Sequence, residues 1–189
     1  MRKIILASAS PRRQEIMTLG GFHYEVEASD AEEEISKEEL DRLLPHEQVE
    51  MLAECKAKDV YTRYSDDEAV MVIGADTVVS VDDTVLGKPS SKEEAVAMLR
   101  LLSGRSHEVY TGVCMMQGGV RKVFSCLTEV VFYQLTEEEI EAYVESGECY
   151  DKAGAYAIQG GAAKFIREIK GDYFNVVGLP LSRLYHEIW

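Results

Sequence analysis

The mostly apolar segment Val70 to Val79 holds an acid in its middle, Asp76. A run this apolar and this rich in valine is the strongest strand signal in the sequence. An ionised carboxylate inside a buried strand costs free energy unless it is paired or binds a metal. We therefore expect a catalytic base or a metal ligand at Asp76. A structural aspartate bonded to backbone N–H groups is the alternative.

Predicted strands and helices alternate along the first part of the chain. The run Ile4–Ala7 predicts a short buried strand. Ser10-Pro11 then predicts a helix start, with a hydroxyl cap and a proline at the first helical position. Extended structure is expected at 22–28 and an acidic loop at 29–41. Apolar residues recur at helical spacing over 45–64, which predicts a helix ahead of the strand.

The later part of the chain is richer in strand signals. Ser91-x-x-Glu94 and Thr136-x-x-Glu139 are capping boxes that predict helix starts, and Asp82-Asp83 predicts a hairpin turn. Further strands are expected at 84–86, 108–117, 120–133, 165–169 and 173–177, with a loop at 151–161 and a last helix at 181–189. This order predicts an α/β fold with a mixed sheet.

The overall charge restricts the partners of the protein. The chain has 189 residues and a formal net charge of −14 at pH 7. The length suits a single compact domain, 1–189, and the charge gives no bulk attraction to nucleic acid or to anionic membranes. No stretch approaches the roughly 18 apolar residues of a membrane span, and the apolar start ends at Ser8, too soon for a signal peptide. We expect a soluble, cytoplasmic protein.

The four cysteines and four histidines are dispersed, without a Cys-x-x-Cys pair or another zinc-site spacing. We expect reduced and mostly buried thiols. A chain of this length buries enough surface to fold without a disulfide or a structural metal.

Two arginines, Arg12 and Arg13, follow the turn Ser8-Ala9-Ser10-Pro11 at a predicted helix start. Free N–H groups and the helix dipole favour an anion there, and arginine adds bidentate contacts to phosphate. Two exposed arginines on a surface helix are the alternative. A Gly-Lys-Ser/Thr phosphate loop is absent from the sequence, which excludes an ordinary P-loop NTPase. Lys56, Lys88 and the run Glu32–Glu34 would each be ordinary on their own.

Several motifs occur in order along essentially the whole chain: Ser8-Ala9-Ser10-Pro11-Arg12-Arg13, Gly74-Ala75-Asp76-Thr77, Gly87-Lys88-Pro89, Ser103-Gly104-Arg105-Ser106-His107, Asp151-Lys152-Ala153-Gly154-Ala155-Tyr156-Ala157-Ile158-Gln159-Gly160, Gly171-Asp172-Tyr173 and Val177-Gly178-Leu179-Pro180. Together they resemble the Maf family of nucleoside triphosphate pyrophosphatases. The resemblance implies a fold like that of the inosine triphosphatase superfamily: a long, mixed, twisted sheet with flanking helices and two lobes around a central cleft.

The resemblance also implies a reaction. A nucleoside triphosphate is cut between its α and β phosphates, which gives the monophosphate and pyrophosphate. A divalent cation, Mg²⁺ or Mn²⁺, is required. Relatives often form homodimers, so a homodimer is expected on that ground alone.

The family's site residues carry over by motif. Asp76 matches the acid that accepts the proton of the attacking water and approaches the metal. Glu33 matches a second acid near the metal, although the run Glu32–Glu34 leaves the register open by one. The other matches are Arg13, Lys56 and Lys88, which hold the phosphates, and Arg12, Thr77 and Gln159, which govern substrate choice. Two departures, Ala31 for a commoner valine and Ala157 for a commoner glycine, touch no charged role.

Gln159 bears on the choice of base. Its side chain offers one acceptor and two donor hydrogens, which suits the imide edge of uracil or thymine. Ser-Pro-Arg-Arg with Ala-Tyr-x-Ile-Gln-Gly resembles the family branch that acts on dTTP and UTP, and a 7-methyl-GTP branch is the alternative. Two other classes stay open: a nucleotide-binding regulator of septum formation and cell division, and a nucleotide-binding domain without catalysis.

Overall fold

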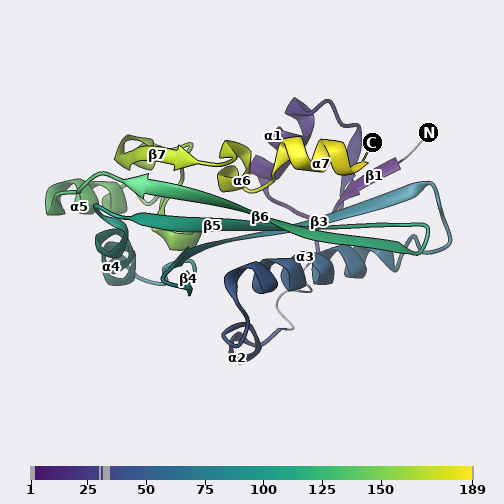
Figure 1. Ribbon diagram of the computed structural model, residues 1–189, viewed down its shortest axis with the longest axis horizontal. Helices are drawn as coiled ribbons and strands as arrows, with labels where there is room; N and C mark the ends of the chain where they lie inside the picture. Colours follow the sequence, from purple (N-terminus) through teal and green to yellow (C-terminus); the bar gives the residue numbers. More distant parts are fainter. Residues whose placement is uncertain (1–2, 30, 32–34, 189) are drawn as a thin grey trace. The chain divides into compact units, whose positions relative to one another are not determined.

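The computed structural model describes residues 3–29, 31 and 35–188. In these ranges the strands form a seven-stranded mixed sheet in the order β2-β1-β3-β5-β6-β7, with β4 paired to β3 (Figure 1). The pairs β1–β2 and β1–β3 are parallel, whereas β3–β4 and β6–β7 are antiparallel. The strands are β1 Lys3–Leu6, β2 Tyr24–Val26, β3 Val70–Val81, β4 Thr84–Leu86, β5 Ser106–Gln117, β6 Val120–Phe132 and β7 Ile166–Lys170. The mixed α/β fold class is confirmed.

Helices precede or follow most of these strands. They are α1 Pro11–Leu19, α2 Lys37–Leu40, α3 Pro45–Tyr61, α4 Lys92–Leu102, α5 Glu137–Glu145, α6 Tyr173–Val177 and α7 Leu181–Ile188, with 3₁₀ turns η2 Ala153–Ala155 and η3 Gly161–Phe165. None of the helices in the described ranges has the length and apolar character needed to cross a membrane.

The chain divides into two compact units. Unit 1 comprises Met1–Asp76, Thr111–Cys126 and Gly178–Trp189, and unit 2 comprises Thr77–Tyr110 and Leu127–Val177. Strands β3, β5 and β6 contribute residues to both units.

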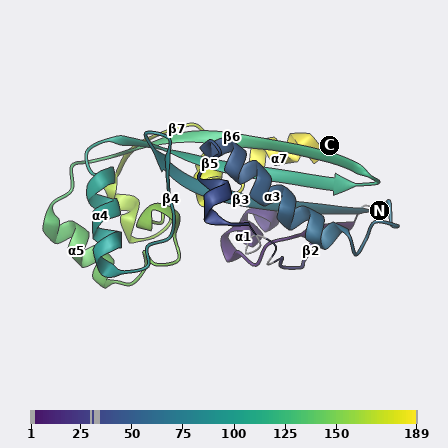
Figure 2. The ribbon, with the colours of Figure 1, turned by 90° about the horizontal axis from the view of Figure 1, so that it is seen from below.

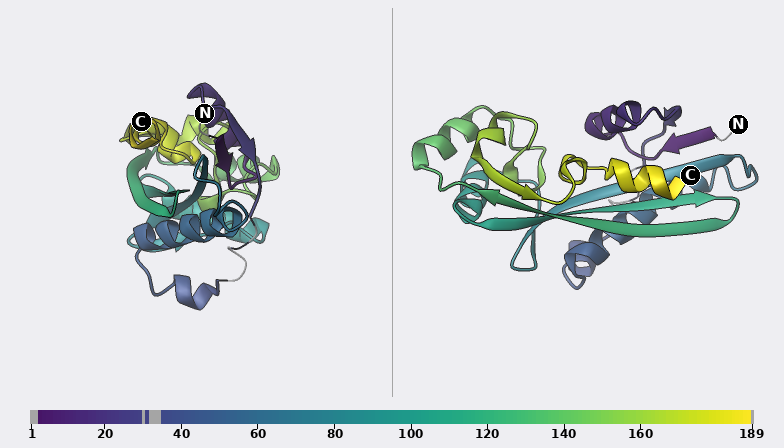
Figure 3. Two further views of the ribbon diagram at one scale, coloured as in Figure 1. Left: turned by 90° about the vertical axis from the view of Figure 1, so that its right-hand side faces the viewer. Right: turned by 45° about the horizontal axis from the view of Figure 1, so that its top comes forward.

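Unit 1 is a three-layer arrangement around β1 and its parallel neighbours. Helices α1 and α7 cover one face of the strands and α3 covers the other (Figures 1 and 3). The core under α3 consists mainly of small and branched side chains from both layers: Ile5, Val70, Val72, Cys114 and Met116 from the strands, Ala7 directly after β1, and Ala53, Ala57 and Val60 from the helix. Side chains alternate between faces along a strand, so Gly74 and Asp76 share the α3 face with Val70 and Val72.

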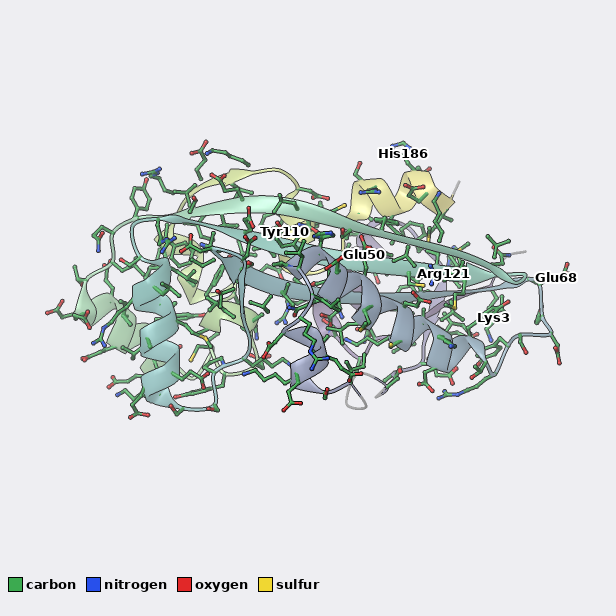
Figure 4. The ribbon with its side chains drawn as sticks, turned by 60° about the horizontal axis from the view of Figure 1, so that its bottom comes forward. Lys3, Glu50, Glu68, Tyr110, Arg121 and His186 are labelled. Atoms are coloured by element: carbon green, nitrogen blue, oxygen red, sulfur yellow. The ribbon has the colours of Figure 1, made fainter. Side chains whose placement is uncertain are left out.

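Two glycines let α3 approach the sheet closely. A Cβ on Gly74 of β3 would lie 2.3 Å from the carbonyl oxygen of Ala53, and one on Gly112 of β5 would lie 2.3 Å from that of Val49. Polar contacts fix the rim of this packing: Ser125 Oγ donates to Glu50 at 2.6 Å, and Arg121 pairs with Glu54. Figure 4 labels Glu50 on the helix and Arg121 on the β5–β6 hairpin.

In unit 2, α4 and α5 lie side by side (Figure 2). Both predicted helix starts are confirmed: Ser91 Oγ accepts from Glu94 N at 3.1 Å, and Thr136 with Glu139 forms a complete capping box. The carboxylate of Glu94 bonds to Ser90 instead of Ser91, so the first box is only half formed. The Asp82-Asp83 hairpin turn is confirmed, with positive φ at both residues.

Three local predictions are wrong. The segment Tyr173–Val177 is helix α6 instead of a strand, because Asp172 Oδ1 accepts from Phe174 N at 2.8 Å and starts a helical turn. Ser10 is the N-cap of α1, but its side chain makes no capping bond. The predicted acidic loop contains α2, which is started by a capping box between Ser36 and Glu39.

The prediction of reduced cysteines is confirmed. All four are free: Cys114 and Cys149 are buried, whereas Cys55 and Cys126 are half-buried. Burial raises the pKa of the Cys114 thiol to about 12, which keeps it protonated and inert at neutral pH.

His107 is a buried histidine in unit 2, and we expect it to make the protein sensitive to acid. Burial, with a smaller contribution from Arg105, lowers its pKa from 6.5 to about 4. The unfolded chain therefore binds a proton between these values and the folded chain does not, so stability falls as pH falls through this window, by about 3 kcal/mol in all. Urea unfolding at several pH values between 7.5 and 4.5 measures this slope. His107→Gln should reduce it, and an equal slope in the variant would contradict the assignment.

Candidate active site

The acid predicted inside the strand is paired with a lysine. Lys56 Nζ of α3 donates to Asp76 Oδ1 of β3 at 2.7 Å, and the two side chains are only 8% and 14% exposed. Gly74 lets the backbone of α3 come close enough for this contact, because it leaves room for Ala53 and Ala57. The pair satisfies the requirement that a buried charge have a partner.

The turn between β1 and α1 is organised by a buried arginine. Arg13 is 9% exposed, so the alternative of two exposed arginines is wrong for this residue. Its Nη1 donates to Ser8 Oγ at 3.1 Å and its Nε donates to Gly178 O at 2.9 Å. Ser8 Oγ also accepts from Ser10 N at 3.3 Å. Arg12, the next residue toward the turn, is half-buried.

Both groups lie near the carboxyl end of β1. This strand pairs in parallel with β2 on one side and β3 on the other, and its last pair is Leu6 with Ile73. The connections through α1 and α3 leave toward opposite faces of the sheet (Figure 3). Open α/β sheets bind ligands at such a switch point, beyond the carboxyl ends of the strands. On β3, Asp76 comes shortly after Ile73, the residue that pairs with the last residue of β1. The Ser8–Arg13 turn follows the end of β1 itself.

In unit 2 a backbone hydrogen bond joins the two segments that carry the predicted residues Lys88 and Gln159. Gly154 N donates to Gly87 O at 3.0 Å, which joins the turn that holds Lys88 to the loop that holds Gln159. The side chains of Lys88 and Gln159 are both exposed. Thr77 follows Asp76 directly along β3 and is half-buried.

The metal prediction finds partial support in the residues present. Glu33 lies outside the described residues. Within the described ranges, His, Cys, Asp and Glu side chains form no group of three or more that could hold a metal. Asp76 supplies a hard carboxylate, however, and Mg²⁺ is commonly held by one or two carboxylates together with substrate phosphates. Asp76 therefore fits as one ligand of a metal that binds together with a triphosphate.

Sequence reasoning missed the contacts that fix these side chains. Ser8 and Gly178 belong to quoted motifs, yet nothing in the sequence indicates that both bond to Arg13. The small residue Gly74 likewise gives no sign in the sequence that the backbone of α3 fills the space beside it.

The fold and the site together are those of an α/β protein with a ligand site at the switch point of its parallel strands. The site contains a buried pair of a carboxylate, Asp76, and an ammonium group, Lys56. Residues 3–188 match the family of Maf-like proteins, and the chain belongs to that family.

Named relatives cover almost the full chain. A dTTP/UTP pyrophosphatase of Bacillus pumilus is 48% identical over 97% of this chain and 93% of its own length. A dTTP/UTP pyrophosphatase of Bacillus anthracis is 50% identical over 100% and 95%. The structure of the Staphylococcus aureus Ham1 protein aligns over 99% of this chain and 98% of its own with 15% identity. The TM-score of this alignment is 0.48.

Proposed function

We propose that this protein is a nucleoside triphosphate pyrophosphatase that hydrolyses dTTP and UTP to the monophosphate and pyrophosphate. The observation that carries the proposal is the Lys56–Asp76 pair at the switch point of unit 1. The activity named for relatives 48% and 50% identical to this chain supports the choice of substrates. The cytoplasmic location, the homodimer and the action of residues 1–189 as one domain stay predictions.

In this proposal Asp76 accepts a proton from the water that attacks the α phosphorus. A new P–O bond forms as the bond from the α phosphorus to the bridging oxygen breaks, and pyrophosphate leaves with that oxygen. Lys56 holds the carboxylate in place from α3. The reaction needs no covalent intermediate.

The basic side chains offset the charge of the triphosphate. Two unit charges 4 Å apart interact by about 4 kcal/mol at an effective dielectric of about 20. A few local cations therefore outweigh the net charge of −14, most of which is distant and screened. We assign phosphate contacts to Arg13, Lys56 and Lys88. Arg13 already bonds to Ser8 and Gly178, so it would also hold the turn in shape for the phosphates.

We further propose a divalent cation, Mg²⁺ or Mn²⁺, held by Asp76 together with phosphate oxygens and a second acid in the run 32–34. When bound, such an ion neutralises developing charge and lowers the pKa of a coordinated water. EDTA should therefore reduce pyrophosphate release by about 100-fold or more, and added Mg²⁺ or Mn²⁺ should restore it. The melting temperature should not change, because in this proposal the ion binds together with the triphosphate. Full activity in EDTA would contradict the metal requirement.

The substrate class can be tested by pyrophosphate release from dTTP, UTP, CTP, ATP, GTP and 7-methyl-GTP. We assign contact with the base to Gln159, with Arg12 and Thr77 also bearing on substrate choice. A site that must bond a base edge rejects wrong edges by about 10⁴-fold, whereas one methyl group is worth only about 10–200-fold. We expect dTTP and UTP to be used and ATP and GTP to be poor. Preference for 7-methyl-GTP would keep the chemistry and overturn the role of Gln159, and no release from any nucleotide would overturn the proposed function.

A further inference from the structure

The exposed Gln159 is placed by the loop that carries it, residues 151–161, which we call the Gln159 loop. Three backbone N–H groups of this loop bond to other segments of unit 2. Gly154 N donates to Gly87 O at 3.0 Å, Ala157 N to Tyr143 Oη at 3.2 Å, and Gly161 N to a Glu148 carboxylate at 2.7 Å. The bonds at Gly154 and Gly161 hold the two ends of the loop.

The middle of the loop is fixed by a side chain that enters the core. Tyr156 is 5% exposed, and its hydroxyl lies 2.7 Å from Nε2 of His107, which is 2% exposed. The ring of Phe132 packs edge-on against both rings. The distance between ring centroids is 5.0 Å to His107 and 4.9 Å to Tyr156. Tyr156 precedes Gln159 by only three residues, so a shift of its ring would also move the residue to which we assign contact with the base.

The backbone before Tyr156 is shaped to turn this side chain inward. Gly154 and Ala155 both have positive φ, 67° and 61°, a conformation that alanine rarely adopts. A Cβ on Gly154 would lie 2.9 Å from a methyl carbon of Val79, so the loop presses directly on β3. A strained residue in a closely packed loop persists only where the surroundings hold it.

We propose that His107 and Tyr156 are positioning residues that hold the Gln159 loop and so set how well the enzyme separates uracil and thymine from cytosine. The inference rests on the proposed function. Both side chains are buried, so we assign them no contact with the substrate. The hydroxyl of Tyr156 and Nε2 of His107 form a side-chain hydrogen bond that joins the middle of this loop to strand β5, and both groups are buried where water does not compete for them.

Tyr156→Phe tests the proposal, because it removes the hydroxyl and keeps the packed ring. We expect KM for UTP to rise about three- to tenfold with kcat changed less than twofold, and the ratio of kcat/KM for UTP over CTP to fall by a similar factor. Tyr110→Phe is the matched control, and Figure 4 labels Tyr110. This variant also removes a tyrosine hydroxyl in unit 2, one that donates to Glu108 at 2.9 Å, and it should leave both quantities unchanged.

A purely structural role for the pair would lower the melting temperature without moving the UTP over CTP ratio, and that result overturns the proposal. Should Tyr156→Phe fail to fold, His107→Gln and His107→Leu supply the same comparison. Glutamine keeps a nitrogen for Tyr156 and leucine does not, so a changed ratio in the leucine variant alone supports the proposal and equal ratios overturn it. Wild-type protein that releases pyrophosphate from neither UTP nor dTTP would overturn the proposed function itself, which keeps the two failures distinct.

Discussion

Asp76→Asn should reduce pyrophosphate release from UTP and dTTP by about 10³-fold, within the range that positioned acid–base groups contribute. The amide has nearly the shape of the carboxylate but cannot accept a proton from water, and it is a poorer metal ligand. Because the amide oxygen of this variant can still accept from Lys56, the pair's geometry survives without the charge of the carboxylate. Initial rates at saturating Mg²⁺ measure the effect.

The matched control for this substitution is Asp82→Asn. Asp82 is also paired with a basic residue, Arg105 at 2.8 Å, but it lies exposed in the turn between β3 and β4. It should keep wild-type rates, since an exposed pair contributes little. An enzyme loses pyrophosphate release in the Asp76 variant, whereas a purely nucleotide-binding regulator keeps its role. Equilibrium dialysis with UTP shows whether the variant still binds the nucleotide. Turnover by Asp76→Asn at more than a tenth of the wild-type rate would remove Asp76 from the role of base.

Features that depend on neighbouring residues could be predicted from the sequence. The helix starts at Ser91 and Thr136 each involve a side chain and an N–H group three residues away, and the Asp82-Asp83 turn connects adjacent strands. Local signals failed where two of them competed. Tyr173–Val177 is rich in residues that favour strands, yet it forms a helix because the carboxylate of Asp172 caps the first helical turn.

The site was predictable in its residues and not in its contacts. Asp76 could be found because an acid is costly in an apolar run. Its partner could not be found in this way. Lys56 is 20 positions away along the chain, and it reaches Asp76 only because α3 packs closely on β3 and β5. Arg13 and Gly178 are 165 positions apart. Contacts of this kind depend on how elements pack, which the spacing of residues along the chain does not encode.

Gly74→Ala tests the close packing of α3 on β3 and should strongly reduce both stability and activity. The added Cβ would lie 2.3 Å from Ala53 O and 2.7 Å from Ala57 N, and both are backbone atoms of α3. A backbone atom in a helix cannot turn aside as a side chain does, so the helix must shift away from the strand. We expect a loss of about 3 kcal/mol in the free energy of unfolding, as for overpacked cores. Lys56 would move away from Asp76, and pyrophosphate release would fall by about tenfold or more.

Gly118→Ala separates this effect from the general cost of replacing glycine. Gly118 lies at the tip of the β5–β6 hairpin with φ of 55°, and a Cβ there meets no atom within 4 Å. It should lose about 1 kcal/mol to backbone strain alone and keep full activity. Adding Ala57→Gly to Gly74→Ala should not restore the protein, because the Ala57 methyl group, at 3.0 Å, is only the third contact after two backbone atoms. Urea unfolding and initial rates on all three variants decide the matter: wild-type stability in Gly74→Ala, or rescue by Ala57→Gly, would show that α3 is not held against β3 in this way.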